Sequence, residues 1–213
     1  EGYKARLHRD AQAALAFASW TEADVGTGRI ADAVVAAVNH KRNLVQWQTA
    51  SQFSEMLRST PQQFEPVLYD FYCGNHEGES FTKLAELIGR DYPLIAYLCF
   101  LKDRDRFLPL RPRTFDIAFG RLGLDFRTDR QCSWENYVQY NGLISHLKTL
   151  LAADLDPDAT LLDAHSFLWI LARQMEEERE REGPSERVYD LVGPPDTETY
   201  IKGLKAIQPR IEP

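Results

Sequence analysis

The sequence lacks the features that mark membrane proteins and disulfide-stabilised proteins. None of its apolar runs approaches the ~18 residues that a membrane-spanning helix needs. It contains only three cysteines (Cys73, Cys99 and Cys132), and no two of them have C-x-x-C spacing. This usage argues against a disulfide scaffold and against a cysteine-based zinc site, and it predicts a reducing, cytoplasmic location.

Familiar enzyme motifs are also missing. The chain has no H-E-x-x-H, no G-x-x-x-x-G-K-[ST] and no G-x-S-x-G sequence, and Gly26-Thr27-Gly28 is too short for a phosphate loop and lacks its lysine. The five histidines are scattered, and none pairs with another ligand at metal-binding spacing. We therefore expect no metal, no cofactor and no catalytic activity in this chain. A nucleophilic Cys73 or Cys99 remains an alternative that the sequence alone leaves open.

The distribution of charge differs from what the net charge suggests. The 213 residues carry 25 Lys and Arg against 32 Asp and Glu, a formal charge of −7, which by itself disfavours a nucleic-acid partner. However, residues 174–200 hold nine acidic and three basic side chains, so most of the negative charge lies near the end of the chain. Residues 101–130 hold eight basic side chains and five aspartates, a net of +3 that is rich in arginine. Arginine suits phosphate and base edges, although a solvated surface with local ion pairs would give the same composition.

Helical periodicity dominates the chain and predicts a mainly α-helical protein with at most short β-strands. Helices are expected over 3–18, 29–39, 50–58, 60–73, 80–89, 91–102, 114–122, 134–151 and 159–182, and short extended pieces over 44–47 and 107–112. Ser80 and Thr114 are expected to cap two of these helices, and Thr60 and Asp91 two others that carry proline in the first turn. We expect one helical domain over residues 1–182, followed by a Pro-rich, acidic C-terminal tail over 183–213.

One helix start combines apolar groups with an expected anion site. In Asp91-Tyr92-Pro93-Leu94-Ile95-Ala96, the three-and-four spacing places Ala96 beneath Pro93 and Tyr92. A helix N-terminus attracts anions, but an apolar cup does not suit a phosphate oxygen, which requires hydrogen bonds. The cup suits a phosphate in which a sulfur atom replaces one oxygen. Packing of Tyr92 and Ala96 into the core is the simpler explanation of the same spacing.

This stretch, together with Arg111-Pro112-Arg113-Thr114-Phe115-Asp116, resembles the sulfur-binding domain of McrA-like type IV restriction endonucleases. The resemblance covers roughly residues 29–170. It implies recognition of phosphorothioate-modified double-stranded DNA, with the sulfur held by Tyr92, Pro93 and Ala96. It also implies backbone contacts from a basic loop, which His40, Lys41 and Arg42 match by composition and order. Because the chain has no HNH pattern, the resemblance implies that cleavage belongs to a fused or partner HNH nuclease.

Two further helix starts are candidate DNA contacts. Arg111, Arg113 and Thr114 surround one of them, and a threonine cap with neighbouring arginines is a plausible phosphate clamp. Ser80, Thr82 and Lys83 form the other. The predicted function is therefore non-catalytic targeting within a modification-dependent restriction system. A helical protein–protein interaction module that binds no DNA is the main alternative.

Overall fold

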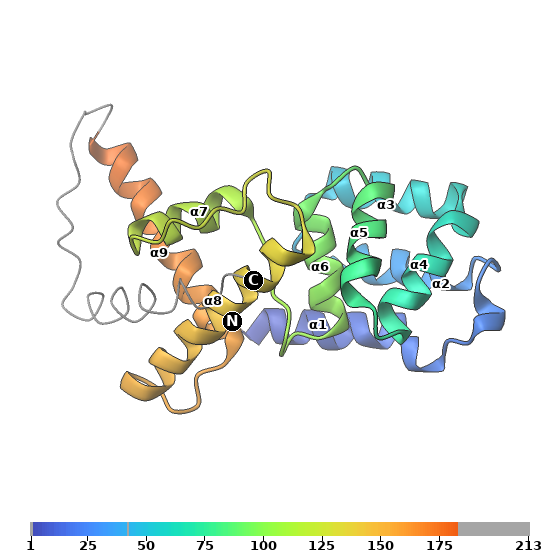
Figure 1. Ribbon diagram of the computed structural model, residues 1–213, viewed down its shortest axis with the longest axis horizontal. Helices are drawn as coiled ribbons and strands as arrows, with labels where there is room; N and C mark the ends of the chain where they lie inside the picture. Colours follow the sequence, from blue (N-terminus) through green and yellow to red (C-terminus); the bar gives the residue numbers. More distant parts are fainter. Residues whose placement is uncertain (1, 42, 183–213) are drawn as a thin grey trace. The chain divides into compact units, whose positions relative to one another are not determined.

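The structure, a computed structural model, describes residues 2–41 and 43–182, with side chains described up to residue 175. Within these residues it contains nine α-helices, two short 3-10 turns and no β-strand, so the prediction of a mainly α-helical protein is confirmed (Figure 1). The extended pieces expected at 44–47 and 107–112 form no strand. The acidic tail expected over 183–213 lies outside the described residues.

The chain divides into two compact units. The first comprises Glu1–Leu110 and Cys132–Trp134, and the second comprises Arg111–Gln131 and Glu135–Pro213. A single helical domain over 1–182 stays a prediction, and each unit is described by itself below.

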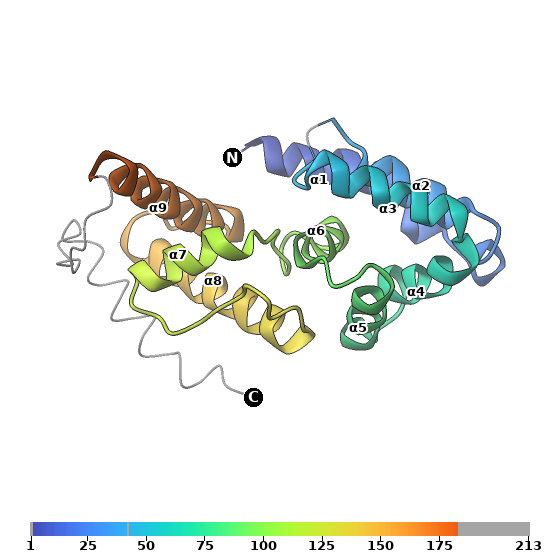
Figure 2. The ribbon, with the colours of Figure 1, turned by 90° about the horizontal axis from the view of Figure 1, so that it is seen from above.

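The first unit is built from six helices: α1 (Gly2–Leu15), α2 (Arg29–Val38), α3 (Trp47–Ser59), α4 (Pro61–Cys73), α5 (Glu77–Leu87) and α6 (Tyr92–Lys102). Helices α1, α2 and α3 run alongside one another (Figure 2), and α6 contacts both α1 and α5. Every residue of α6 from Leu94 to Leu101 is buried. A helix that is apolar on all sides belongs in a core, so α6 is the central helix of this unit.

The second unit contains α7 (Pro112–Arg121), α8 (Trp134–Asp154) and α9 (Leu161–Glu182). An aromatic cluster joins its helices. The Phe115 ring lies edge-on to Tyr140 with centroids 5.3 Å apart and lies 4.9 Å from the ring of His165. His165 is itself buried within this cluster.

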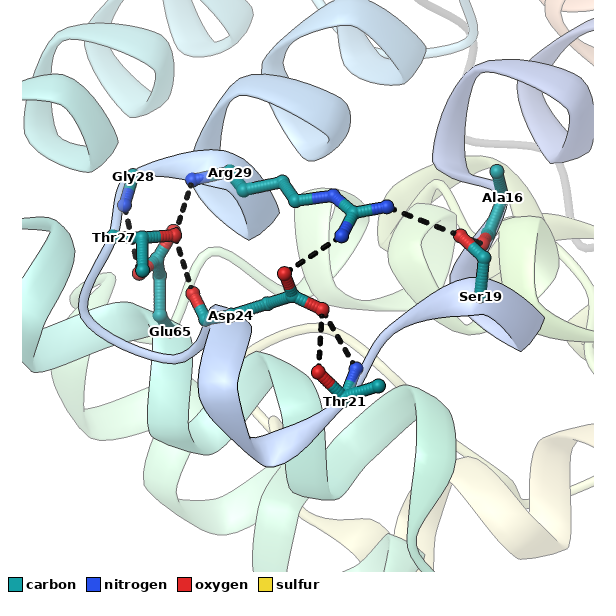
Figure 3. A network of polar contacts seen from close by, with 8 residues as sticks. All are labelled: Ala16, Ser19, Thr21, Asp24, Thr27, Gly28, Arg29 and Glu65. Atoms are coloured by element: carbon teal, nitrogen blue, oxygen red, sulfur yellow. Dashed lines mark hydrogen bonds and ion pairs between the residues drawn. The ribbon is translucent and has the colours of Figure 1, made fainter.

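A buried carboxylate organises the loop before α2. Glu65 of α4 is fully buried, and its Oε2 accepts hydrogen bonds from the backbone N–H groups of Gly26 (2.6 Å) and Gly28 (3.1 Å). Its Oε1 accepts a third from Ala31 N–H at 2.9 Å. The amide groups of Gly26 and Gly28 therefore point at Glu65, which occupies the position that an external anion would need. Figure 3 shows the contact between Gly28 and Glu65.

A second network fixes the same loop from outside. Asp24 accepts from the backbone N–H of Thr21 (2.8 Å) and from the Arg29 guanidinium (2.7 Å), and Arg29 also reaches Ser19 (Figure 3). The Thr21 backbone hydrogen bond, followed by the Arg29 hydrogen bond, holds the pKa of Asp24 below its usual value. The Asp24 network thus links the turns at 19–24 to the start of α2, while the Glu65 network links the same loop to α4.

Tyr97 on α6 provides a test of the core. It is fully buried, and its hydroxyl has no hydrogen-bond partner among the described residues; burial raises its pKa. An unsatisfied buried hydroxyl costs about 1–3 kcal/mol, so Tyr97→Phe should raise the free energy of unfolding by about 1 kcal/mol. That corresponds to a rise of about 2–4 °C in Tm, measured by circular dichroism.

Tyr72→Phe is the matched control, because the Tyr72 hydroxyl donates to the carbonyl oxygen of Leu98 at 3.3 Å. That substitution removes a satisfied bond and should lower Tm. A lower Tm for both variants would show that the Tyr97 hydroxyl does have a partner.

Candidate functional site

The start of α6 has the cap that the sequence predicts. Asp91 is the N-cap, its Oδ1 accepts from the backbone N–H of Leu94 at 3.0 Å, and Pro93 lies in the first turn. The Ile95 N–H donates to the Asp91 carbonyl oxygen at 3.0 Å, and proline has no N–H at all. Because these donors are used or missing, the turn around Pro93 presents apolar surface instead of an ordinary oxyanion site.

The three residues predicted to hold sulfur differ in accessibility. Tyr92 is 3% exposed and Ala96 is 0% exposed, whereas Pro93 is partly exposed. The Tyr92 ring packs edge-on against Phe81, with the centroids 6.2 Å apart. The structure thus brings the three residues together, with Pro93 at the surface and Tyr92 and Ala96 in the interior.

The start of α3 lies beside this turn. Thr49 Oγ1 is 3.5 Å from Asp91 Oδ2, which connects the first turns of α3 and α6. Trp47, the first residue of α3, is 74% exposed and is the most exposed large hydrophobic residue among those described. Trp47 was not among the predicted site residues, because the sequence pattern predicts an extended piece over 44–47 before the helix.

His40 and Lys41 line a small cavity in the first unit. The cavity has a volume of about 170 Å³ and is also lined by Tyr3, Arg6, Leu7 and Asp10. His40 Nε2 is 3.5 Å from Asp10 Oδ2. Arg42, the third residue of the predicted basic loop, lies outside the described residues.

Arg6 is a cation of this region that was not among the predicted site residues. It is exposed on α1 and also lines a second cavity of about 720 Å³, whose wall includes Arg9, Arg104 and Lys102. Lys102 is paired with Glu77 at 2.9 Å. Asp10 lines the smaller cavity, and Asp103 and Asp105 line the larger one, but among the described side chains neither Arg6 nor Lys41 forms an ion pair. Nothing in the sequence signals this pairing of Arg6 with Lys41, since the two are separated by α2 and two turns.

The proposed helix start at Ser80 is wrong. Helix α5 begins at Glu77 after the N-cap His76, with Glu77 and Glu79 in its first turn, where acidic side chains are favoured. Ser80 is buried inside the helix, whereas Thr82 and Lys83 are exposed on it. The argument from a helix N-terminus therefore does not apply to these three residues, and a DNA contact there stays a prediction.

The helix start near Thr114 is also shifted. Helix α7 begins at Pro112 with Arg111 as N-cap, so Thr114 lies in the first turn and is not the cap. Arg111 and Arg113 are both exposed, and the Arg111 guanidinium lies over the Trp169 ring, 5.5 Å from its centroid. A guanidinium that stacks on an indole ring through its flat face can still donate hydrogen bonds from the N–H groups at its edge.

The cysteines do not have the surroundings of a nucleophile. Cys99 is fully buried in α6, and burial raises the pKa of the Cys73 thiol. Burial raises the pKa of Cys132 to about 11, and the opposing effect of Arg90 is smaller. A reactive cysteine needs a lowered pKa, and the raised pKa values of Cys73 and Cys132 are the opposite of that condition.

No group of three or more potential metal ligands occurs among the side chains that the structure describes. The same part of the chain contains no helix with both the length and the apolar character needed to cross a membrane. Comparison of the chain with protein-family models, with curated proteins and with solved structures finds no match.

Proposed function

We propose that this chain binds phosphorothioate-modified double-stranded DNA and serves as the targeting module of a modification-dependent restriction system. The observation that carries the proposal is the first turn of α6, where Pro93 is partly exposed, Tyr92 and Ala96 are buried, and the amide groups of Leu94 and Ile95 already have acceptors. In this proposal the sulfur contacts the Pro93 ring, and Tyr92 and Ala96 support that ring from beneath. Cleavage belongs to an HNH nuclease domain or partner.

The preference for sulfur over oxygen in this proposal follows from the free-energy cost of removing water from each atom. A phosphate oxygen that enters this turn loses its hydrogen bonds to water and finds few donors in exchange, which is unfavourable. Sulfur is larger and is a weak acceptor, so it loses little when it leaves water and gains dispersion contacts with the ring. The Asp91 carboxylate repels both backbones alike, because both carry the same charge, so the discrimination depends on the difference in desolvation and the attraction has to come from cations elsewhere.

The cations of the first unit supply the attraction that the turn lacks. Lys41 and Arg6 border the smaller cavity, and the segment from Lys41 leads within six residues to Trp47 at the start of α3. Thr49, in the same first turn, contacts the N-cap of α6. In this proposal, Lys41 and Arg6 contact phosphates near the modified one while the sulfur contacts Pro93.

A titration tests the proposal directly. Two duplexes that differ only in a single phosphorothioate are labelled and titrated with the chain, with binding followed by fluorescence anisotropy between 50 and 200 mM salt. We expect tighter binding to the modified duplex, and binding that weakens steeply as salt rises. Equal affinity for the two duplexes would overturn the proposal. Salt-insensitive association with another protein, and none with DNA, would instead identify an interaction module.

Replacement of Pro93 tests the turn itself. Pro93→Ala removes the ring and restores an N–H, so an oxygen becomes as acceptable there as a sulfur. We expect the preference for the modified duplex to fall by about tenfold, equivalent to about 1.4 kcal/mol, while affinity for the unmodified duplex changes little.

The matched control is Pro61→Ala, at the first position of α4. It changes a first-turn proline in the same way but lies at another helix start. If Pro61→Ala reduced the preference as much as Pro93→Ala does, the effect would reflect stability, and the sulfur contact would be assigned to the wrong place.

A further inference from the structure

A buried aspartate in the second unit binds a loop to the start of α7. Asp116 is 7% exposed, and its Oδ1 accepts from both the backbone N–H and the hydroxyl of Thr128, each at 2.7 Å. Its Oδ2 accepts from the backbone N–H of Asp129 at 3.1 Å. Thr128 is fully buried, and its Oγ1 also lies 3.3 Å from the carbonyl oxygen of Pro112. We call these contacts the Asp116 clasp.

The Asp116 clasp brings two pairs of arginines together. Arg111 and Arg113 flank Pro112, while Arg127 precedes Thr128 and Arg130 follows it by two residues. All four side chains are exposed. Within the described part of the chain, none of the four has a carboxylate at ion-pairing distance. The clasp thus holds together two segments whose exposed arginines are 14 to 19 positions apart, counted from the numbering.

The loop that carries Arg127 and Arg130 is held in a defined conformation. Asn136 of α8 donates to the Arg127 carbonyl oxygen at 2.8 Å, and the Gln131 N–H donates to the Thr128 carbonyl oxygen at 3.1 Å. Arg130 has φ +61°, in the left-handed region, which costs a non-glycine residue about 1–2 kcal/mol. The clasp offsets this cost and fixes the backbone from which the two arginines extend.

We propose that the Asp116 clasp assembles Arg111, Arg113, Arg127 and Arg130 into a surface that binds the phosphate backbone of duplex DNA without regard to the sulfur. The choice of duplex DNA as the partner rests on the proposed function. Arg127 and Arg130 are contact residues in this proposal, and Asp116 and Thr128 are positioning residues. Because Asp125 and Asp129 lie on the same loop, the surface is only weakly cationic, and its affinity for DNA alone is modest.

The character of the surface favours a nucleic acid over a protein. The centre of a protein–protein interface requires large apolar anchors. None of the exposed large hydrophobic residues of the described chain lies within residues 111–131. The arginine guanidinium groups here have no ion-pair partner among the described residues and extend from a fixed backbone. Such groups suit bidentate contacts with phosphate oxygens.

The test is the salt dependence of binding to the unmodified and the modified duplex. The slope of log K against log salt falls by about 0.9 for each phosphate contact removed. Arg127→Gln with Arg130→Gln should therefore flatten the slope by about two and weaken binding to both duplexes by the same factor, so that the preference for phosphorothioate stays unchanged. An unchanged slope overturns the proposal.

The control pair is Arg58→Gln with Lys148→Gln, which removes the same charge from α3 and from the later part of α8. We expect it to leave the slope unchanged. If it flattened the slope equally, the effect would be one of total charge, and the proposal of a local surface would be wrong. Polyglutamate that competes as effectively as unmodified duplex would also overturn it, because the surface would then bind any polyanion.

The positioning role is tested by Asp116→Asn and by the milder Thr128→Val, which removes only the hydroxyl from the clasp. Both should speed hydrogen exchange at the amides of Thr128 and Asp129 and flatten the salt slope. If the amides lose protection and the slope is unchanged, the clasp is structural only and the proposal fails. Suppose that the unsubstituted chain shows no preference for the phosphorothioate duplex, but the Arg127 and Arg130 substitutions still flatten the salt slope. That result would refute the proposed function and leave the arginine surface standing.

Discussion

Replacing Glu65 by alanine should cost the protein about 3–5 kcal/mol of unfolding free energy, the effect typical of breaking a buried polar network. Three backbone N–H groups, of Gly26, Gly28 and Ala31, lose their acceptor at once. Ala31 N–H is buried at the start of α2, so water cannot replace the carboxylate without opening the helix packing. In thermal denaturation we expect Tm to fall by about 10 °C.

Two comparisons separate the network from a general effect of substitution. Glu65→Gln keeps the shape and one acceptor oxygen, so it should lose about half as much stability as Glu65→Ala. Glu55→Ala, at an exposed position on α3, removes a carboxylate of the same type without breaking contacts of this kind and should change Tm by less than about 2 °C. A Glu65→Ala protein as stable as the Glu55→Ala protein would show that the loop amides do not depend on Glu65.

Helix starts that contain proline could be predicted from the sequence. Thr60-Pro61 and Asp91 with Pro93 mark the starts of α4 and α6 correctly, because proline fixes φ and requires no N–H partner in the first turn. The predictions at Ser80 and Thr114 failed because a stronger local signal was overlooked. Pro112 begins α7 before Thr114, and the acidic residues that follow His76 begin α5 before Ser80.

The candidate site could be predicted only in part. Tyr92 and Ala96 belong to a run that is apolar on every side of the helix, and this pattern indicates burial of α6 as a whole. The same run therefore predicts that Tyr92 and Ala96 pack in the core as readily as it predicts that they line an apolar binding site. Pro93 reaches the surface because it lies at the end of that central helix.

The contacts that Glu65 and Asp116 make with distant segments could not be predicted from the residues around them in the sequence. Glu65 binds amides more than 30 positions earlier, and Asp116 binds a loop 12 positions later. Each is a single carboxylate in a helix, and the residues next to it in sequence do not distinguish it from a carboxylate that faces solvent. The pairing depends on which helices pack together, which periodicity does not specify.

Reversing the charges of Arg6 and Lys41 should produce the largest effect on DNA binding. Both are exposed and border the cavity of about 170 Å³ in the first unit. Arg6→Glu with Lys41→Glu replaces two attractive contacts by two repulsive ones, so we expect affinity for modified and unmodified duplexes to fall by about 100-fold, equivalent to about 2.7 kcal/mol. Because neither side chain is buried, Tm should change by less than about 2 °C.

The ratio of the two affinities decides what this loss means. Arg58→Glu with Lys148→Glu is the matched charge reversal, and we expect it to weaken binding far less. If Lys41 and Arg6 hold phosphates while Pro93 contacts the sulfur, the preference for phosphorothioate survives the reversal even though both affinities fall. If the preference disappears instead, sulfur recognition depends on these cations, and the division between an apolar contact for sulfur and a cationic contact for the backbone is wrong. An unchanged affinity would remove the cavity from the binding surface altogether.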